Sequence, residues 1–589
     1  VYLGKGATNR KQTVRRLWGY LDNYRGKLLT VVFALLLTSG LAVMLPWLFG
    51  SALDAISELD FQRAYTLGAY IVIVSLLNSI VRFVGRYTMT IIAQSTVAKI
   101  RKDTFDKLQN LPIKYYDTNQ SGDIISRLTN DVDLISNSLA SVVTELISSV
   151  ITLIGSLVMM FIVSWSLALI VIIFVPLMAF FTAKISKVTR KGFIAQQKHL
   201  GELNGIIEES ISGLKVIKLY GNEEETAEEF QETNERLRDA GYKANVYSGF
   251  IMPVINFLNN LIYVVIVIVG AALFVSGRVA ITPGDIASIT QYARQFIQPI
   301  SNLAQLFNTL QQGLAGAERV FKLIDEETEY VEDGTEEVER LKGALEFKNV
   351  SFAYETDKPV LKNINFTADG GKTVAIVGPT GSGKTTIINL INRFYDIDEG
   401  EILIDGLNIN EYKKDHLRKN IGVVLQDTQL FTGTVYENIV YGDLEASKEA
   451  VEEASKLANA HDFIMKLPHG YDSEVYEGGQ NFSQGERQLI SIARTILSNP
   501  DILILDEATS NVDTRTEFKI QASMRTLMKG RTSFVIAHRL QTIRNANRIL
   551  VIKDGELIEN GNHHELLHQK GFYYDLYTTQ FKNLVLEEE

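Results

Sequence analysis

The first half of the chain is dominated by long apolar stretches that contain almost no charged residues. Residues 28–53 contain no Asp, Glu, Lys or Arg. At a rise of about 1.5 Å per residue, this run is long enough to cross the ~30 Å hydrocarbon core of a bilayer. Similar runs cover residues 64–98, where Arg82 and Arg86 interrupt, and residues 244–277. Each of these runs predicts a membrane-spanning helix.

The apolar run at residues 146–183 is too long for a single span. Near its middle, Ser164-Trp165-Ser166 combines polar residues with an interfacial aromatic residue, so we expect two helices joined by a tight turn. A sixth helix is predicted over residues 286–317, after the start signal Thr282-Pro283-Gly284-Asp285 and with Arg294 as its only charge. The pattern therefore predicts six membrane-spanning helices.

Lys and Arg are unevenly distributed among the segments that connect these helices. The N-terminal segment, residues 1–27, carries seven of them, whereas Arg63 alone lies between the first two helices. Residues 99–145 and 184–243 are also rich in Lys and Arg. Because these residues collect in cytoplasmic segments, we expect the N-terminus, both long segments and everything after the sixth helix to be cytoplasmic.

Both long segments also show the apolar spacing of helices, as at Ile207, Ile211 and Leu214. Each is interrupted once, at residues 119–122 and at residues 220–222. We therefore expect the membrane helices to continue beyond the bilayer and to return after a turn. The two resulting extensions would contact another cytoplasmic structure at their tips.

The pattern changes after Arg319. Residues 325–343 are acidic and predict a solvated linker. From residue 344 to residue 589, short β-type runs such as residues 373–377 and 502–505 alternate with helical segments. The predicted fold class is a multidomain membrane protein: a six-helix all-α transmembrane domain, residues 28–324, followed by an α/β domain.

Composition narrows the range of functions. The mean hydropathy of +0.06 over 589 residues averages two unlike halves. The chain contains no Cys, which excludes disulfides, thiolate metal sites and Cys nucleophiles. The net charge of −11 argues against a mainly nucleic-acid-binding surface.

A glycine-rich loop follows the apolar run at residues 373–377. Its sequence, Gly378-Pro379-Thr380-Gly381-Ser382-Gly383-Lys384-Thr385, matches the phosphate-binding P-loop, and a helix is expected to start near Thr386. The glycines let backbone N–H groups face phosphate oxygens, Lys384 reaches the β and γ phosphates, and Thr385 offers a hydroxyl to Mg²⁺. The α/β domain is thus predicted to be a P-loop nucleotide-binding domain.

Two carboxylates end the apolar run at residues 502–505. Asp506 suits a Mg²⁺ site, and Glu507 suits a general base that polarises the attacking water. Together with the P-loop, this pair predicts nucleotide hydrolysis.

These motifs resemble those of the ATP-binding cassette (ABC) transporters, and the resemblance covers nearly the whole chain. It implies that the nucleotide is ATP, that Tyr354 stacks on adenine, and that Gln426 senses Mg²⁺ and the attacking water. It also implies that His538 contacts the γ-phosphate and that Asp513 lies in the loop that communicates between two ATP sites. The arrangement resembles the exporter type, in which two such chains form the working unit.

The signature segment departs from the family pattern. Leu-Ser-Gly-Gly-Gln corresponds here to Phe482-Ser483-Gln484-Gly485-Glu486. Ser483 and Gly485 are kept, whereas Gln484 adds bulk and Glu486 adds a carboxylate where the family binds the γ-phosphate held by the other subunit. Because the hydrolytic residues are intact, the chain resembles one subunit of heterodimeric bacterial multidrug exporters. Its partner would carry a complete signature and a deficient catalytic carboxylate; a tolerant homodimer is the alternative.

The resemblance predicts ATP-driven export of small amphiphilic or lipophilic compounds, that is multidrug efflux, across a bacterial plasma membrane by alternating access. A lipid flippase of the same fold is the alternative. The expected cofactors are ATP and Mg²⁺, and the expected partners are the lipid bilayer and a second half-transporter, with no nucleic acid. Arg82, Arg86 and Arg294 are candidates for the lining of a substrate cavity, and Asp54 for an outer gate.

Overall fold

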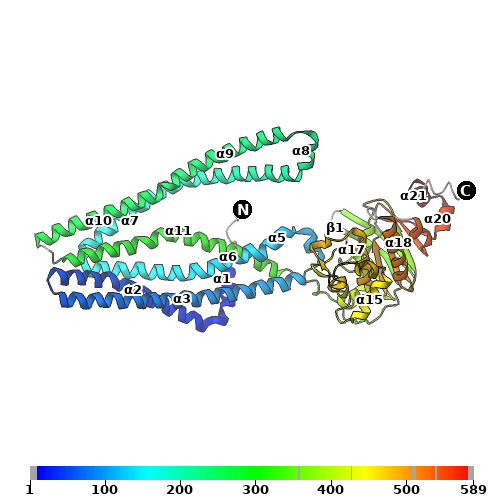
Figure 1. Ribbon diagram of the computed structural model, residues 1–589, viewed down its shortest axis with the longest axis horizontal. Helices are drawn as coiled ribbons and strands as arrows, with labels where there is room; N and C mark the ends of the chain where they lie inside the picture. The colour runs from blue at the N-terminus through cyan, green and yellow to red at the C-terminus, as the bar shows by residue number, and fades with distance from the viewer. Residues whose placement is uncertain are drawn as a thin grey trace. The chain divides into compact units, whose positions relative to one another are not determined.

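The computed structural model describes residues 10–277, 279–355, 358–425, 428–506, 513–536 and 540–580. It contains two compact units, one formed by Val1–Asp106 and Gly122–Asp325 and the other by Lys107–Ser121 and Glu326–Glu589. The first unit is helical, and the second combines sheets with helices (Figure 1).

Long helices make up the first unit. They are α1 (Arg10–Leu21), α2 (Arg25–Ser57), α3 (Phe61–Gln109), α7 (Val143–Ser212), α9 (Glu223–Gly249), α10 (Ile251–Ser276) and α11 (Pro283–Asp325). Shorter helices connect them, namely α5 (Ser121–Ser126), α6 (Val132–Asn137) and α8 (Leu214–Tyr220). Two π-helical turns, Arg127–Asp131 and Ser138–Val142, flank α6.

Four helical stretches of the described chain are long and apolar enough to cross a membrane, namely Arg10–Ser57, Phe61–Gln109, Ser121–Ser212 and Glu223–Ser276. The third contains the predicted turn, because Ser164 inside α7 has non-helical dihedral angles (φ −158°, ψ 105°). It therefore supplies two of the six predicted spans. α11 has the required length but carries more polar residues, so its crossing of the bilayer remains a prediction.

The fifth predicted helix is divided in the structure. Residues 244–277 form the end of α9 and the whole of α10, with Phe250 between the two helices. α10 ends at Ser276, and the next residue, Gly277, has a φ of 62° in the left-handed region that favours glycine.

The second predicted extension is a helical hairpin. α8 follows α7, and the chain then turns at Gly221, where φ is 68°. α9 returns alongside α7 (Figure 1). The two helices approach closely, since a Cβ atom on Gly192 would lie 2.9 Å from the Cα of Ala244.

α2 and α11 are joined by hydrogen bonds around a proline. Pro46 lies inside α2 and has no N–H, so the Ala42 carbonyl four residues earlier has no helical donor. α11 supplies donors: Gln295 Nε2 donates to the Ala42 carbonyl (3.0 Å), and the Tyr292 hydroxyl donates to the Val43 carbonyl (2.7 Å). Polar residues of α11 are therefore held against α2 inside the apolar bundle.

Two principal sheets form the second unit. One is antiparallel, in the order β2 (Lys358–Ala368), β1 (Leu345–Glu355), β4 (Glu399–Ile404), β5 (Leu407–Asn408). The other has the order β12 (Glu556–Gly561), β11 (Arg548–Lys553), β3 (Thr373–Val377), β10 (Thr532–Ile536), β9 (Ile502–Asp506), β6 (Ile421–Val424). All its neighbouring strands are parallel except β11 and β12. β7 (Gly433–Thr434) and β8 (Glu474–Val475) pair separately.

Helices cover the second unit. They are α4 (Ile113–Thr118), α12 (Lys384–Ile391), α13 (Lys414–Lys419), α14 (Val435–Val440), α15 (Lys448–Leu457), α16 (His461–Ile464), α17 (Gln484–Ser498), α18 (Thr514–Met528), α19 (Leu540–Asn545), α20 (His563–Gln569) and α21 (Phe572–Gln580).

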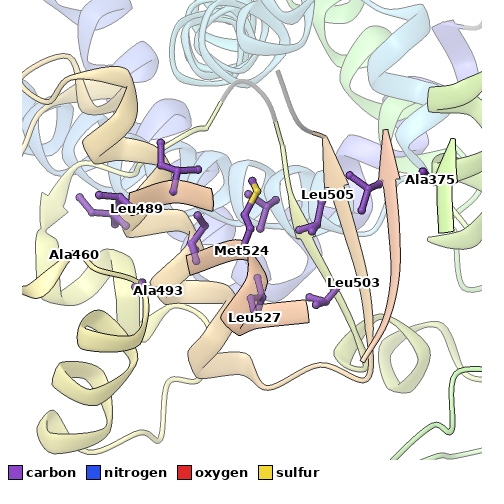
Figure 2. Packing of buried hydrophobic residues seen from close by; sticks show 14 of the residues in the cluster. Ala375, Ala460, Leu489, Ala493, Leu503, Leu505, Met524 and Leu527 are labelled. Atoms are coloured by element: carbon purple, nitrogen blue, oxygen red, sulfur yellow. The ribbon is translucent and has the colours of Figure 1, made fainter. Parts of the chain in front are cut away.

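The six-stranded sheet is buried on both faces, which explains its continuous apolar runs. Successive residues of β3 alternate between two cores: Val374 packs with the antiparallel sheet and α12, whereas Ala375 packs with α17 and α18. Figure 2 shows the second of these cores, which contains Leu489 of α17, Met524 of α18 and Leu505 of β9.

Part of the acidic segment after α11 packs against the rest of the second unit, to which this segment belongs. The Glu329 carboxylate accepts a hydrogen bond from Arg418 (2.8 Å), and Arg393 donates to the Glu332 carbonyl (2.9 Å). Because the Arg393 side chain is almost fully buried, it needs such acceptors. The expectation of a solvated linker is therefore corrected for this part of the segment.

Candidate ATP site and membrane pocket

The P-loop lies between β3 and α12, as the sequence predicts. Gly378, Gly381 and Gly383 have φ values of 154°, 81° and 104°. A Cβ atom on Gly378 would lie 2.0 Å from the carbonyl oxygen of Ile552. The loop thus requires glycine for both its conformation and its packing.

Lys384 and Ser382 of this loop are suited to phosphate oxygens. The Lys384 ammonium donates to the carbonyls of Gly378 (2.9 Å) and Pro379 (2.8 Å). Burial lowers the pKa of Lys384, and the nearby Asp506 carboxylate opposes that shift. The Ser382 hydroxyl is buried and has no hydrogen-bond partner among the described residues. A bound phosphate would satisfy both groups.

The Mg²⁺ ligands expected from the sequence lie near one edge of the six-stranded sheet. Asp506 is the last residue of β9, and Thr385 lies in the first turn of α12, which follows β3 through the P-loop. β3, β10, β9 and β6 are parallel, so their carboxyl ends meet at this edge. Gln426, Glu507 and His538 lie outside the described residues and follow β6, β9 and β10 in the chain.

Tyr354, the expected adenine-stacking residue, belongs to an aromatic cluster. Its ring lies 4.9 Å from those of Phe352 and Tyr395, edge to face in both cases. Its hydroxyl donates to Thr386 Oγ1 (3.3 Å) and accepts from Asn389 (3.1 Å). The side chain is 37% exposed, so the cluster holds the ring at the surface where a base can stack on it.

Tyr395 connects this cluster to the first of the two predicted extensions, a role that sequence reasoning missed. Its hydroxyl donates to the carboxylate of Asp117, which lies in α4 at the predicted tip. Burial and this hydrogen bond raise the pKa of Tyr395, because both disfavour the phenolate. Tyr395 lies between α12 and β4 in the chain, and no motif in the sequence identifies Asp117 as its partner.

The signature segment shows what its unusual acid does. Ser483 is the N-cap of α17, and its hydroxyl accepts a hydrogen bond from the N–H of Glu486 (3.3 Å). In return, the Glu486 carboxylate accepts from the N–H (2.9 Å) and the hydroxyl (2.8 Å) of Ser483. Gly485 is buried in the first turn. The Glu486 carboxylate therefore occupies the N–H and the hydroxyl of Ser483 at the N-terminus of α17. The resemblance to ABC transporters implies that these groups would bind phosphate.

Asp513 begins α18. Its carboxylate accepts from the N–H groups of Thr516 (3.0 Å) and Arg515 (3.1 Å). These hydrogen bonds, chiefly those to Thr516, lower the pKa of Asp513 and keep it ionised.

A polar pocket of 430 Å³ lies among α2, α3, α7 and α11 in the first unit. Arg82 and Arg86 line it, as does Glu145, which pairs with Arg86 at 3.8 Å. Asn78 and Gln295 also line it, and each has a buried carbonyl oxygen without a hydrogen-bond partner in the described chain. Asn78, Arg82 and Arg86 are spaced by four residues, so one face of a helix carries all three. This spacing is a signal in the sequence from which Asn78 could have been predicted to line the same site as the two arginines.

Arg294 and Asp54 lie elsewhere. The Arg294 guanidinium donates to the Tyr263 hydroxyl (3.0 Å) and lies 5.4 Å from that ring, and Arg294 does not line the pocket. Asp54 accepts from the Thr282 hydroxyl (2.8 Å) and from the N–H of Gly284 (2.7 Å). Asp54 therefore joins the end of α2 to the start of α11.

Comparisons with known proteins identify both units. Residues 28–300 match the family model of the ABC transporter transmembrane region, and residues 361–510 match a second family model, described as ABC transporter. The chain is 44% identical over 583 residues to an uncharacterized ABC transporter ATP-binding protein of Bacillus subtilis (strain 168), covering 98% of this chain and 95% of the relative.

Two relatives have names that state a substrate. A fatty acid ABC transporter ATP-binding/permease protein of Mycobacterium bovis is 44% identical over 488 residues, which are 83% of this chain and 77% of the relative. An ATP-dependent lipid A-core flippase of Syntrophus aciditrophicus is 38% identical over 582 residues, 98% of this chain and 96% of the relative. With a transmembrane region and an ATP-binding cassette in one chain, this protein belongs to the ABC transporter family as an exporter half-transporter that hydrolyses ATP with Mg²⁺.

Proposed function

We propose that this chain is half of an ATP-driven exporter of lipid-like amphiphiles. The observation that carries the proposal is its similarity, over nearly its whole length, to a protein named a lipid A-core flippase. A relative named a fatty acid transporter adds support. These names favour the lipid alternative of the sequence prediction over multidrug efflux.

In this proposal, ATP binding and hydrolysis drive alternating access across a bacterial plasma membrane. Glu507 is the general base, Gln426 and His538 contact the attacking water and the γ-phosphate, and Thr385 and Asp506 hold Mg²⁺. The N-terminus and the nucleotide-binding domain lie in the cytoplasm, in line with the distribution of Lys and Arg.

The second half-transporter is proposed to be a different chain. The Glu486 carboxylate accepts two hydrogen bonds from Ser483 at the start of α17. It would repel a γ-phosphate presented there by another subunit. A partner with a neutral signature would complete the ATP site that contains Glu507 of this chain. Native mass and ATPase rate of the chain expressed alone test this point, and a stable, fully active homodimer would contradict it.

The transport proposal is tested in inside-out membrane vesicles that contain this chain and any partner that copurifies with it. Uptake of a fluorescent fatty acid is compared with uptake of ethidium, each with ATP and with the Glu507→Gln variant as control. ATP-dependent uptake of the fatty acid above that of ethidium is expected. Uptake of ethidium alone would instead support multidrug efflux.

A further inference from the structure

We propose that the pocket among α2, α3, α7 and α11 binds the anionic headgroup of an amphiphile, with Arg82 as the cation that pairs with it. This inference rests on the proposed function, because it specifies the substrate class of that exporter. The shared chemistry is a single carboxylate or phosphate attached to an acyl chain.

The pocket is lined by two positive side chains, Arg82 and Arg86, and by one negative side chain, Glu145. Of its two arginines, Arg86 is paired with Glu145 at 3.8 Å. Arg82 forms no ion pair with any acidic residue of the described chain. One positive charge is thus left for a ligand in this polar pocket, where the Arg82 side chain is exposed and an anion can reach it.

The remaining polar groups provide acceptors for a headgroup. Gln295 uses its amide nitrogen to bond the Ala42 carbonyl, so its oxygen is left free. The side-chain oxygen of Asn78 is also buried without a partner in the described residues. Two unpaired acceptors beside a cation suit a headgroup that carries O–H or N–H donors near its anionic group.

The depth of the charged residues matches the boundary of a membrane. Arg82 lies about 32 Å along α3 from Phe61, at about 1.5 Å per residue. Glu145 lies about 28 Å along α7 from the break at Ser164. Since the hydrocarbon core is ~30 Å thick, both lie at the end opposite the turns, where lipid headgroups begin. With the proposed orientation, that end faces the inner leaflet, so a lipid can enter headgroup first.

The test is binding by the purified full-length protein in detergent, measured without ATP. Oleate is compared with oleyl alcohol, and phosphatidylglycerol with phosphatidylcholine. Wild type is expected to bind oleate, phosphatidylglycerol or both about tenfold more tightly than the matched uncharged or zwitterionic lipid, the size expected of one charge-assisted hydrogen bond. Preference for oleate alone would show that the site takes a carboxylate headgroup. Preference for phosphatidylglycerol alone would show that it takes a phosphate headgroup. No preference for either anion would overturn the proposal.

Two variants are expected to change oleate binding in opposite directions, and this distinguishes headgroup binding from a purely structural role of these residues. Arg82→Gln should remove the preference for anions, while Arg82→Lys should retain most of it. Glu145→Gln frees Arg86 and should strengthen oleate binding several-fold. Arg63→Gln, at an exposed position outside the pocket, is the matched control and should leave binding unchanged. If Arg82→Gln binds oleate as tightly as wild type, or Glu145→Gln binds it more weakly, the assignment is wrong.

This outcome is independent of the transport assay. A protein that moves lipid with ATP but shows no anion preference would keep the proposed function and lose the headgroup site. A protein that shows the preference but moves no lipid would keep the site and lose the function.

Discussion

At the scale of single residues, the signature segment shows how one substitution changes the role of a helix N-terminus. The Ser483 hydroxyl and N–H both donate to the Glu486 carboxylate. The same reciprocal arrangement stabilises two other helix starts, Thr434 with Glu437 and Asn562 with Glu565. A stabilising cap and a phosphate site need the same backbone groups, so in α17 the two functions compete.

Replacing Glu486 by Gln should raise the ATPase rate of the chain expressed alone. The change removes the negative charge that faces an incoming γ-phosphate, and the amide oxygen can still accept from Ser483. We expect a gain of about tenfold or more, which corresponds to the lower end of the roughly 1.5–3 kcal/mol of a hydrogen bond to a charged group. The measurement is phosphate release by purified protein.

Glu565→Gln is the matched control for this experiment. It changes the equivalent cap residue of α20, which has the same two capping-box hydrogen bonds to backbone N–H groups, and should leave the ATPase rate unchanged. An unchanged rate for Glu486→Gln, or an equal gain for Glu565→Gln, would contradict the competition described above.

Tyr354 gives a second residue-scale prediction. Tyr354→Ala should weaken binding of a fluorescent ATP analogue by roughly fivefold to a hundredfold, because stacking of a base on an aromatic ring contributes about 1–3 kcal/mol. Tyr354→Trp keeps a stacking surface and should bind within a few-fold of wild type. Equal losses in the two variants would show that the ring packs the cluster with Phe352 and Tyr395 without holding adenine.

At the scale of elements, α2 and α11 act as one unit. Pro46 removes one helical hydrogen bond from α2. Tyr292 and Gln295 of α11 donate to carbonyls of the turn before it. Near the end of α2, the Asp54 carboxylate accepts hydrogen bonds from Thr282 and Gly284 at the start of α11. There the backbones nearly touch, since a Cβ atom on Gly284 would lie 2.1 Å from the Gly50 carbonyl oxygen. Hydrogen bonds between these helices therefore position one wall of the membrane pocket.

Asp54→Ala should lower the thermal stability of the first unit. It removes the acceptor of two hydrogen bonds to a carboxylate, a loss of about 1.5–3 kcal/mol for each. Asp54→Asn keeps one acceptor oxygen and should lose about half as much. Glu58→Ala is the control, since the Glu58 side chain forms an exposed ion pair with Arg63 at 3.5 Å, which contributes little to stability. Melting followed by tryptophan fluorescence in detergent measures the difference, and equal melting temperatures for Asp54→Ala and wild type would refute it.

At the scale of the whole molecule, sequence patterns predicted the organisation and the local motifs but not the contacts between distant segments. Uncharged runs and the break at Ser164 predicted the membrane helices because hydrocarbon excludes charge. The P-loop could be placed because its glycines and Lys384 act locally. The link between Tyr395 and Asp117 joins residues far apart in the chain, and no periodicity reports it.

The same limit applies to charge. The acidic segment before β1 looked solvated, because its partners Arg393 and Arg418 are distant in sequence. Arg82 and Arg86 were visible as charges in an apolar run, but only the fold shows that both line one pocket and that Glu145 pairs with Arg86. Arg294, which looked equivalent in sequence, packs on Tyr263.

Lipid transfer between leaflets tests the central claim most directly. The full-length protein, with any copurifying partner, is reconstituted in liposomes that contain a fluorescent anionic lipid. After ATP and Mg²⁺ are added, the fraction of the fluorescent lipid that an external quencher can reach is followed over time. The account predicts an ATP-dependent change in that fraction, which is absent in the Glu507→Gln variant. The same accessible fraction with and without ATP, in liposomes whose protein hydrolyses ATP, would contradict it.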